Sequence, residues 1–124
     1  MQPLSIIRGN LSAGLPDART EEQFETLVSD GSVRVERIVS RGQASPPGFW
    51  YEQPQREWVL VVAGRAALEI DGEVQTVELG PGDWIDIPAG CRHRVLWTAR
   101  DEQTLWLAVY FAPHATSDAA HHEP

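Results

Sequence analysis

The chain has 124 residues, a length that suits a single domain with a hydrophobic core of its own. Its 10 lysine and arginine residues stand against 18 aspartate and glutamate residues, so the formal net charge at pH 7 is −8. Nucleic acids and anionic membrane surfaces attract basic proteins, and this charge argues against both as the main partner. The longest apolar runs, at 58–63 and 105–112, are too short to span a membrane.

Cysteine content and the start of the chain bear on the compartment. Cys91 is the single cysteine, which excludes an internal disulfide and suits a reducing environment. Residues 1–10 lack the long apolar core and the basic flank of a secretory signal. We therefore expect a soluble, cytoplasmic protein.

The first third of the chain has two predicted parts. Residues 1–19 mix glycine, proline and asparagine with few apolar positions, which predicts an N-terminal arm with one short strand at 4–7. Residues 20–29 fit either a helix that begins at a capping box or a strand in which Phe24 and Val28 share a face. Because residues 33–39 alternate like a strand after a turn at 30–31, we favour a strand pair.

The rest of the chain alternates between short strand patterns and turn signals. Asp71-Gly72 is a strong hairpin signal, and glycine and proline mark further turns at 80–82 and 88–90. The predicted strands are 58–62, 66–70, 73–79, 84–87, 92–98 and 104–111. Strands at a spacing of roughly ten residues, with no convincing long helix after residue 30, predict an all-β sandwich or barrel. We expect one domain over 20–112 and a tail over 113–124.

Two stretches resemble the signature motifs of the cupin superfamily, which read G-x5-H-x-H-x3/4-E-x6-G and G-x5-P-x-G-x2-H-x3-N. Glu57 and Gly64 match the second half of the first motif, with only apolar residues between them. The second motif is matched by Gly82, Pro88, Gly90 and His93. The resemblance covers about half of the chain and implies a cupin-type jelly-roll β-barrel or sandwich.

The histidine pair of the first motif and the asparagine of the second are replaced. Tyr51 and Gln53 stand at the two histidine positions, and Trp97 stands at the asparagine position. A register with one more spacer residue would instead place Trp50 and Glu52 at the histidine positions. The resemblance therefore implies the fold more strongly than any one activity, since one fold hosts many functions.

The resemblance implies that Tyr51, Gln53, Glu57 and His93 surround one point inside the barrel. Carboxylate oxygen and imidazole nitrogen are good ligands for zinc, iron, nickel, copper or manganese, and an amide oxygen is a weaker one. We expect a divalent transition metal held by Glu57 and His93 with Gln53 assisting. Such an ion would polarise a bound oxygen or activate a water molecule.

Two alternatives need no ion. Glu57 and His93 can form a buried hydrogen-bonded pair that only satisfies both groups. They can also serve a metal-free reaction, in which His93 is the base, Tyr51 is the acid, and Glu57 raises the pKa of His93. The second alternative resembles the sugar-nucleotide epimerases of the superfamily.

Aromatic and basic side chains near the site are candidate substrate contacts. Trp50, Tyr51 and Trp97 can line a sugar or small-molecule pocket, although such rings also simply fill barrels. Arg37 alternates with Val35 and Val39, and we expect it to point inward and contact the ligand.

The function expected from these residues is a metal-dependent cupin enzyme, an isomerase, lyase or dioxygenase, acting on a sugar, sugar phosphate or carboxylic acid. The rival is a non-catalytic domain that binds or senses a small molecule. The strand at 58–62 is apolar at every position, so both of its faces should be covered. Together with the resemblance, this predicts a homodimer.

Overall fold

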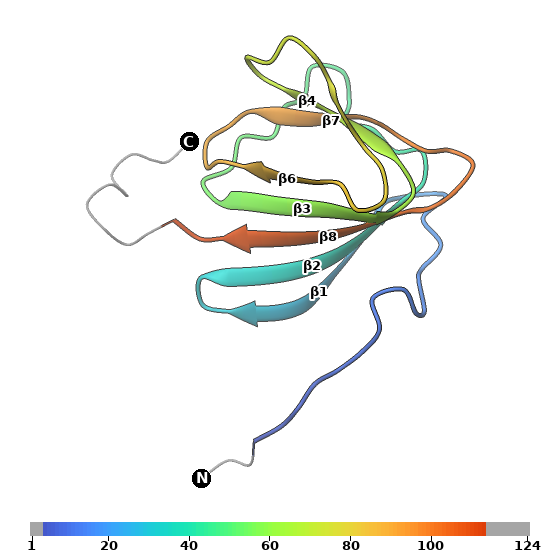
Figure 1. The fold of residues 1–124 in the computed structure, drawn as a ribbon, viewed down its shortest axis with the longest axis vertical. Coiled ribbons are helices and arrows are strands. Elements are labelled where there is room, and N and C mark those ends of the chain that lie inside the picture. Colours follow the sequence, from blue (N-terminus) through green and yellow to red (C-terminus); the bar gives the residue numbers. More distant parts are fainter. Residues whose placement is uncertain (1–3, 114–124) are drawn as a thin grey trace.

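The computed structural model describes residues 4–113, and every regular element among them is a β-strand (Figure 1). None of these residues belongs to a helix that could cross a membrane. The strands are β1 (Gln23–Asp30), β2 (Val33–Ser40), β3 (Arg56–Ala63), β4 (Ala66–Ile70), β5 (Val77–Leu79), β6 (Trp84–Ile87), β7 (His93–Thr98) and β8 (Thr104–Phe111).

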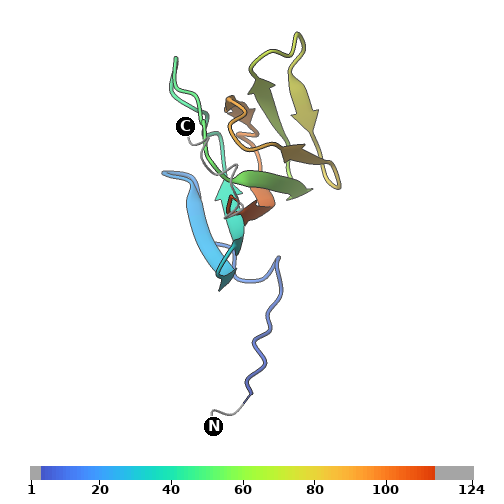
Figure 2. The same cartoon turned by 90° about the vertical axis from the view of Figure 1, so that its left-hand side faces the viewer.

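The strands form two antiparallel sheets. The larger sheet has the order β1-β2-β8-β3-β6, and the smaller sheet has the order β5-β4-β7. Figure 2 shows β1 and β2 at one side of the molecule and the β4–β5 hairpin at the other. Because β8 lies between β2 and β3, the last strand of the chain joins two strands from its first half. The predicted all-β jelly-roll architecture is confirmed.

Residues 23–30 form a strand, which settles the ambiguity between helix and strand. β1 pairs along its length with β2, and its register shifts once between Thr26 and Val28. Edge pairing fixes the strand here, since most of its side chains are exposed. The short strand predicted at residues 4–7 is not present, because that segment makes no ladder and its side chains are exposed.

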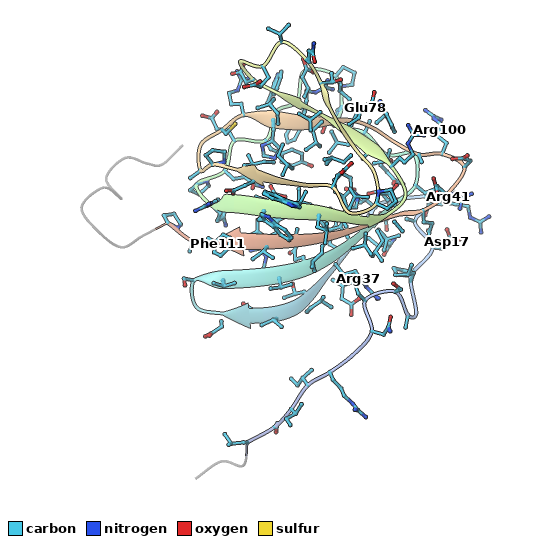
Figure 3. All side chains as sticks on the ribbon, in the orientation of Figure 1. Asp17, Arg37, Arg41, Glu78, Arg100 and Phe111 are labelled. Carbon is cyan, nitrogen blue, oxygen red and sulfur yellow. The ribbon has the colours of Figure 1, made fainter. Side chains whose placement is uncertain are left out.

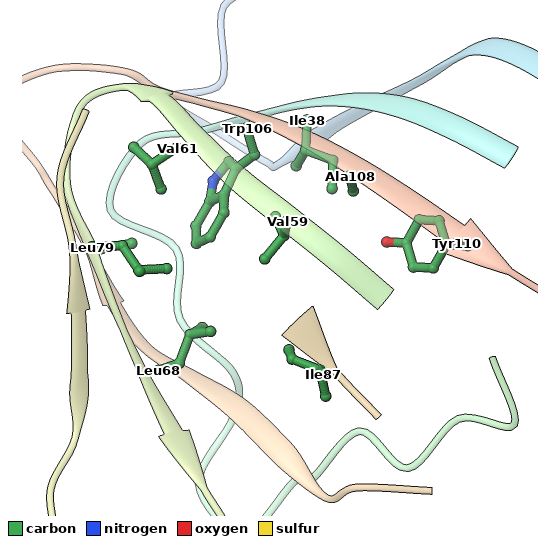
Figure 4. Close-up of a cluster of buried hydrophobic side chains, with 10 residues drawn as sticks. Ile38, Val59, Val61, Leu68, Leu79, Ile87, Trp106, Ala108 and Tyr110 are labelled. Atoms are coloured by element: carbon green, nitrogen blue, oxygen red, sulfur yellow. The ribbon is translucent and has the colours of Figure 1, made fainter. Parts of the chain in front are cut away.

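The main core lies between the two sheets. Val59 and Val61 of β3 point into it and are almost fully buried, whereas Trp58 and Leu60 are half-buried on the outer face of the large sheet. This is the period-two alternation of a strand. Figure 4 shows the buried cluster, which consists of Ile38, Val59, Val61, Ala66, Leu68, Leu79, Ile87, Trp106, Ala108 and Tyr110.

The outer face of the large sheet carries an apolar row that crosses four strands. Val28, Val35, Val109 and Trp58 are neighbours in the strand register. None of these four side chains is fully buried in the single chain. Coverage of this row by a second copy, and hence the homodimer, stays a prediction.

The N-terminal arm covers another part of that outer face. Ala18 is fully buried against Val39 and Leu105, and Leu11 and Leu15 pack against the same cluster. The amide of Ala18 donates a hydrogen bond of 2.7 Å to the side-chain oxygen of Gln103. The end of the arm is therefore part of the folded body.

Arg37 secures the arm, and the prediction that it points into the barrel is wrong. Its Nη1 atom donates to the carbonyls of Leu11 (3.1 Å) and Ala13 (2.8 Å), and Nη2 donates to Glu25 (2.6 Å). Figure 3 shows Arg37 where the arm passes the β1–β2 pair. The predicted alternation with Val35 and Val39 is correct, but all three residues share the outer face.

Replacing Arg37 by leucine should release the arm. Two backbone carbonyls would lose charge-assisted hydrogen bonds, so we expect the free energy of unfolding to fall by about 2 kcal/mol. Limited proteolysis should then cleave the arm faster. Glu25→Gln is the control, since it removes only an exposed ion pair worth less than about 1 kcal/mol. Equal effects of the two substitutions would show that the hydrogen bonds from Arg37 to the arm do not stabilise it.

Candidate functional site

A cavity of about 250 Å³ lies inside the sandwich, beside the main core. Its apolar wall is formed by core residues such as Val59, Leu68 and Trp106. Its polar side chains come from four strands and two loops, and they are Glu22, Arg34, Glu36, Tyr51, Gln53, Glu57, His93 and Tyr110. The predicted grouping of Tyr51, Gln53, Glu57 and His93 around one interior space is thus present.

Backbone hydrogen bonds hold Tyr51 and His93 side by side. The amide of Tyr51 donates to the carbonyl of His93 (2.7 Å), and the amide of His93 donates back to Tyr51 (3.0 Å). The two rings stack with their centroids 5.5 Å apart. One residue pair further along, Gly90 donates to the carbonyl of Gln53 at 2.8 Å. The loop before β3 is therefore aligned on the turn that precedes β7.

His93 and Glu57 meet at the buried end of the site. His93 Nε2 lies 3.5 Å from Glu57 Oε1, and their side chains are only 8% and 13% exposed. His93 Nδ1 lies 3.1 Å from the carbonyl of Cys91. A carbonyl oxygen can only accept, so Nδ1 carries the hydrogen and, in the neutral ring, Nε2 keeps its lone pair.

The protonation of His93 depends on the balance between burial and its partners. Burial lowers the pKa of His93, but Glu57 and the carbonyl of Cys91 outweigh this effect, and the pKa is raised above its ordinary value. His93 therefore gains a proton more readily than a solvated histidine when no ion occupies the site.

Gln53 has an unsatisfied acceptor. Its Oε1 atom is buried and has no hydrogen-bond partner among residues 4–113. Buried polar atoms of folded proteins nearly always have a partner, so this oxygen is available to a bound ligand, water or cation. It belongs to the same cavity as Glu57 and His93.

The site partly fits a transition metal. Zinc binds nitrogen and oxygen ligands at about 2.0–2.2 Å in tetrahedral geometry, which puts two ligands of one ion roughly 3.4 Å apart. The separation of 3.5 Å between His93 Nε2 and Glu57 Oε1 matches this spacing. Gln53 supplies a third oxygen, but it is a weak ligand. The described part of the chain holds no cluster of three or more histidine, cysteine, aspartate or glutamate side chains placed for a metal.

Both cavity tyrosines are held neutral. Burial raises the pKa of Tyr51, and Glu22 and Glu57 raise it further. Burial also raises the pKa of Tyr110 well above its ordinary value, with Glu57 and Glu36 adding to the shift. Each phenol is therefore a firm hydrogen-bond donor and a poor source of a free proton near pH 7.

The cavity lining also contains four polar residues that were not predicted from the sequence: Glu22, Arg34, Glu36 and Tyr110. The signal for three of them was present, because 34, 36 and 38 alternate along β2 and 106, 108 and 110 alternate along β8. Assigning those positions to the inner face would have identified them. Glu22 precedes β1, and no pattern in the sequence marks it.

Glu22 is held by a hydrogen-bonded chain that starts in the core. Trp106 Nε1 donates to Ser40 Oγ at 3.0 Å, and the Ser40 hydroxyl donates to Glu22 Oε2. Ser40 is fully buried. Burial raises the pKa of the Glu22 carboxyl, and the hydrogen bond from Ser40 opposes this shift without cancelling it.

The variant Glu22→Gln should change how stability depends on pH. A carboxyl whose pKa is raised by folding favours the native state at low pH, and this advantage is lost as pH rises through the raised pKa. We therefore expect the stability of Glu22→Gln, relative to the native chain, to increase with pH and then level off. Chemical denaturation from pH 4 to 8 measures this difference. A stability difference that is constant or falls with pH would contradict the raised pKa of the Glu22 carboxyl.

Trp50 and Trp97 do not line the cavity, and their predicted contact with a substrate stays a prediction. Arg92 lies over the ring of Trp50 at 5.0 Å, and Trp50 does not line the cavity. Trp97 is 37% exposed and lies outside the cavity as well. The β7–β4 register shifts between Val95 and Trp97, so Trp97 turns away from the side that His93 faces.

The fold and the site together define a β-sandwich protein with an internal cavity that is partly polar. The family model described as Cupin domain matches residues 35–110. The chain therefore belongs to the cupin family. The resemblance found in the sequence motifs is thus confirmed, although two histidines of the first motif remain replaced by Tyr51 and Gln53.

Several solved structures match most of this chain. A protein of Ralstonia eutropha JMP134, provisionally named a mannose-6-phosphate isomerase, shares 48% sequence identity at a TM-score of 0.83, over 86% of this chain and 99% of that one. A conserved protein of unknown function from Streptococcus pyogenes has 24% identity and a TM-score of 0.66, over 92% and 100% of the two chains.

A cupin superfamily protein from Desulfitobacterium hafniense DCB-2 has 19% identity and a TM-score of 0.68, over 90% and 96% of the two chains. These last two similarities concern the fold alone. The comparison with curated proteins gives no significant match.

Proposed function

We propose that the chain is a cupin enzyme that acts on a small polar substrate inside the sandwich, with a divalent transition metal held by His93 and Glu57. The observation that carries this proposal is the pair itself. Its separation of 3.5 Å is long for a hydrogen bond and matches two ligands of one tetrahedral ion. The unpartnered Oε1 atom of Gln53 supports the same reading as a third, weaker ligand.

Each residue near the ion has a defined task. The carbonyl of Cys91 fixes the hydrogen on His93 Nδ1 and so presents Nε2 to the cavity, as the outer partners of metal-binding histidines do. Glu57 supplies a carboxylate oxygen and negative charge. Tyr51 is stacked on His93, and its neutral phenol would donate a hydrogen bond to the substrate. The ion itself would supply a Lewis acid for a substrate oxygen.

The size of the cavity limits the substrate. A volume of about 250 Å³ lies below the range of roughly 300–1,000 Å³ usual for drug-sized ligands. This supports a compound of about monosaccharide size, and it counts against a sugar nucleotide. The 48% identical relative carries the name of a sugar-phosphate isomerase, which supports a sugar-related substrate here.

A metal-free acid–base enzyme is the second candidate. It is favoured by the raised pKa of His93, since a protonated imidazole beside Glu57 forms a stable ion pair without any metal. Tyr51 would then be the hydrogen-bond donor to the substrate. A non-catalytic binding domain would use the same cavity but would show no turnover.

Metal analysis of protein purified without an affinity tag or chelator tests the proposal. We expect close to one equivalent of a transition metal per chain, lost in His93→Ala with an unchanged far-UV circular dichroism spectrum. His114, His121 and His122 could also bind metal and lie outside the described residues, so the His93 variant is the necessary control. A metal content near zero, unchanged after incubation with zinc, iron, nickel, copper and manganese salts, would overturn the proposed metal site. It would favour the metal-free acid–base enzyme.

A further inference from the structure

Arg34 is the basic residue that the cavity holds in a fixed orientation. Its guanidinium carbon lies 4.4 Å from the centre of the Tyr110 ring, which supports the flat group from one side. Its Nε atom donates to Glu36 Oε2 at 2.9 Å. Ring stacking and an ion pair together leave the side chain little rotational freedom.

The outer end of this guanidinium is available. Among the residues that the structure describes, the hydrogen bond from Nε to Glu36 is the only one that the Arg34 side chain donates. Both Nη atoms are therefore open to a ligand. Arg37 provides the contrast, because its Nη atoms are used up by the arm and by Glu25.

Arg34 and the His93–Glu57 pair lie at different depths. The Arg34 side chain is 40% exposed, whereas those of Glu57 and His93 are 13% and 8% exposed. All three line the same cavity. A ligand that reaches the buried pair with one end can therefore meet Arg34 with the other, more solvated end.

We propose that Arg34 binds a carboxylate of the substrate through its two Nη atoms, which makes the substrate a small hydroxylated carboxylic acid such as a sugar acid. This inference rests on the proposed function, since it assumes that the buried pair is the reactive end. Two parallel N–H groups match the two oxygens of a carboxylate. The nearby carboxylates of Glu36 and Glu57 accept hydrogen bonds from hydroxyl groups on the body of the ligand.

The charges of the cavity favour a carboxylate over a phosphate ester. A phosphate monoester carries about −1.5 to −2 charges at pH 7, against one for a carboxylate. Arg34 is the single arginine in the lining, and it already shares its charge with Glu36. Glu22 and Glu57 line the same space, and the whole chain has a formal charge of −8. Arg34 can balance the single charge of a carboxylate, whereas a dianion at the same place would keep at least one unmatched negative charge.

Matched sugars that differ only at their sixth carbon separate these classes. Isothermal titration of the chain with D-mannose, D-mannuronate and D-mannose 6-phosphate, and with the corresponding glucose series, compares a neutral, a carboxylate and a phosphate group. We expect the carboxylate to bind tightest in at least one series. Arg34→Gln should weaken that binding about tenfold to a hundredfold. Arg34→Lys keeps the positive charge but loses the two parallel N–H donors, so it should weaken binding less than Arg34→Gln does.

Arg56→Gln is the control for net charge. Arg56 is paired with Asp86 and lies outside the cavity, so its removal should leave carboxylate binding unchanged. Thermal unfolding of each variant verifies that the chain still folds, and Arg34→Lys carries the test if Arg34→Gln does not.

The outcomes distinguish this inference from the proposed function. If the phosphate or the neutral sugar binds tightest, and binding needs His93 but not Arg34, the cavity is functional and the carboxylate assignment is overturned. Carboxylate binding that persists in Arg34→Gln overturns it too. If no member of either series binds at millimolar concentration, the sugar-related function fails together with the inference.

Discussion

Replacing Gly64 by alanine should lower the free energy of unfolding by about 3 kcal/mol or more. Gly64 has a φ of +89°, in the left-handed region that L-residues rarely adopt. A Cβ atom there would lie 2.4 Å from Thr104 Oγ1, 2.5 Å from Thr104 Cα and 2.8 Å from the carbonyl of Gln103. Two of these atoms are backbone, so the crowding cannot be relieved by a side-chain rotation. Backbone strain and overpacking therefore add.

Gly72→Ala is the matched control for Gly64→Ala. Gly72 has a similar φ of +93°, but a Cβ atom there would meet nothing within 4 Å. Its substitution should cost only the backbone strain, about 1 kcal/mol. Urea denaturation of both variants measures the difference. Equal losses would show that the close approach of Thr104 to Gly64 has no energetic weight.

Removing either His93 or Glu57 should lower the affinity for zinc by more than about a hundredfold. Loss of a supporting partner around a metal ligand already costs about 10- to 100-fold, and these residues are proposed as ligands themselves. Gln53→Leu should cost only about tenfold, because an amide oxygen is the weakest donor of the three. Competition with a chromophoric chelator gives the affinity of His93→Ala, Glu57→Ala and Gln53→Leu.

We expect His93→Ala and Glu57→Ala to weaken zinc binding more than Gln53→Leu does. Tyr51→Phe serves as the control, since it keeps the ring that stacks on His93 and removes only the hydroxyl. It should bind zinc nearly as well as the native chain. If Glu57→Ala keeps the native affinity, the contact with His93 is a structural pair and not a shared ligand set.

Much of the fold follows from local signals in the sequence. The turn glycines illustrate this, since Gly64, Gly82 and Gly90 all adopt positive φ values where the motifs place them. These positions depend on the backbone alone, so they can be recognised without knowing the partner strands. The apolar run in β3 likewise predicted a buried strand, and Val59 and Val61 are in the core.

The site was only partly predictable, because the facing of a side chain depends on strand register. A shift in the β4–β7 register beside Ala67 turns Trp97 outward, and no residue type in β7 indicates this shift. Arg37 was assigned to the wrong face of β2, although its neighbours Arg34 and Glu36 do line the cavity. Glu22 is held at the site by its hydrogen bond with Ser40, which lies 18 residues further along the chain. Such a tertiary contact leaves no local pattern in the sequence.

Anomalous diffraction from a crystal soaked in zinc locates any metal bound in the cavity. We expect a peak inside the cavity, at about 2.0–2.2 Å from His93 Nε2 and from a carboxylate oxygen of Glu57, with Gln53 Oε1 turned toward it. A cavity without a peak, in which His93 and Glu57 remain in direct contact, would contradict the metal site and leave the metal-free acid–base pair in its place.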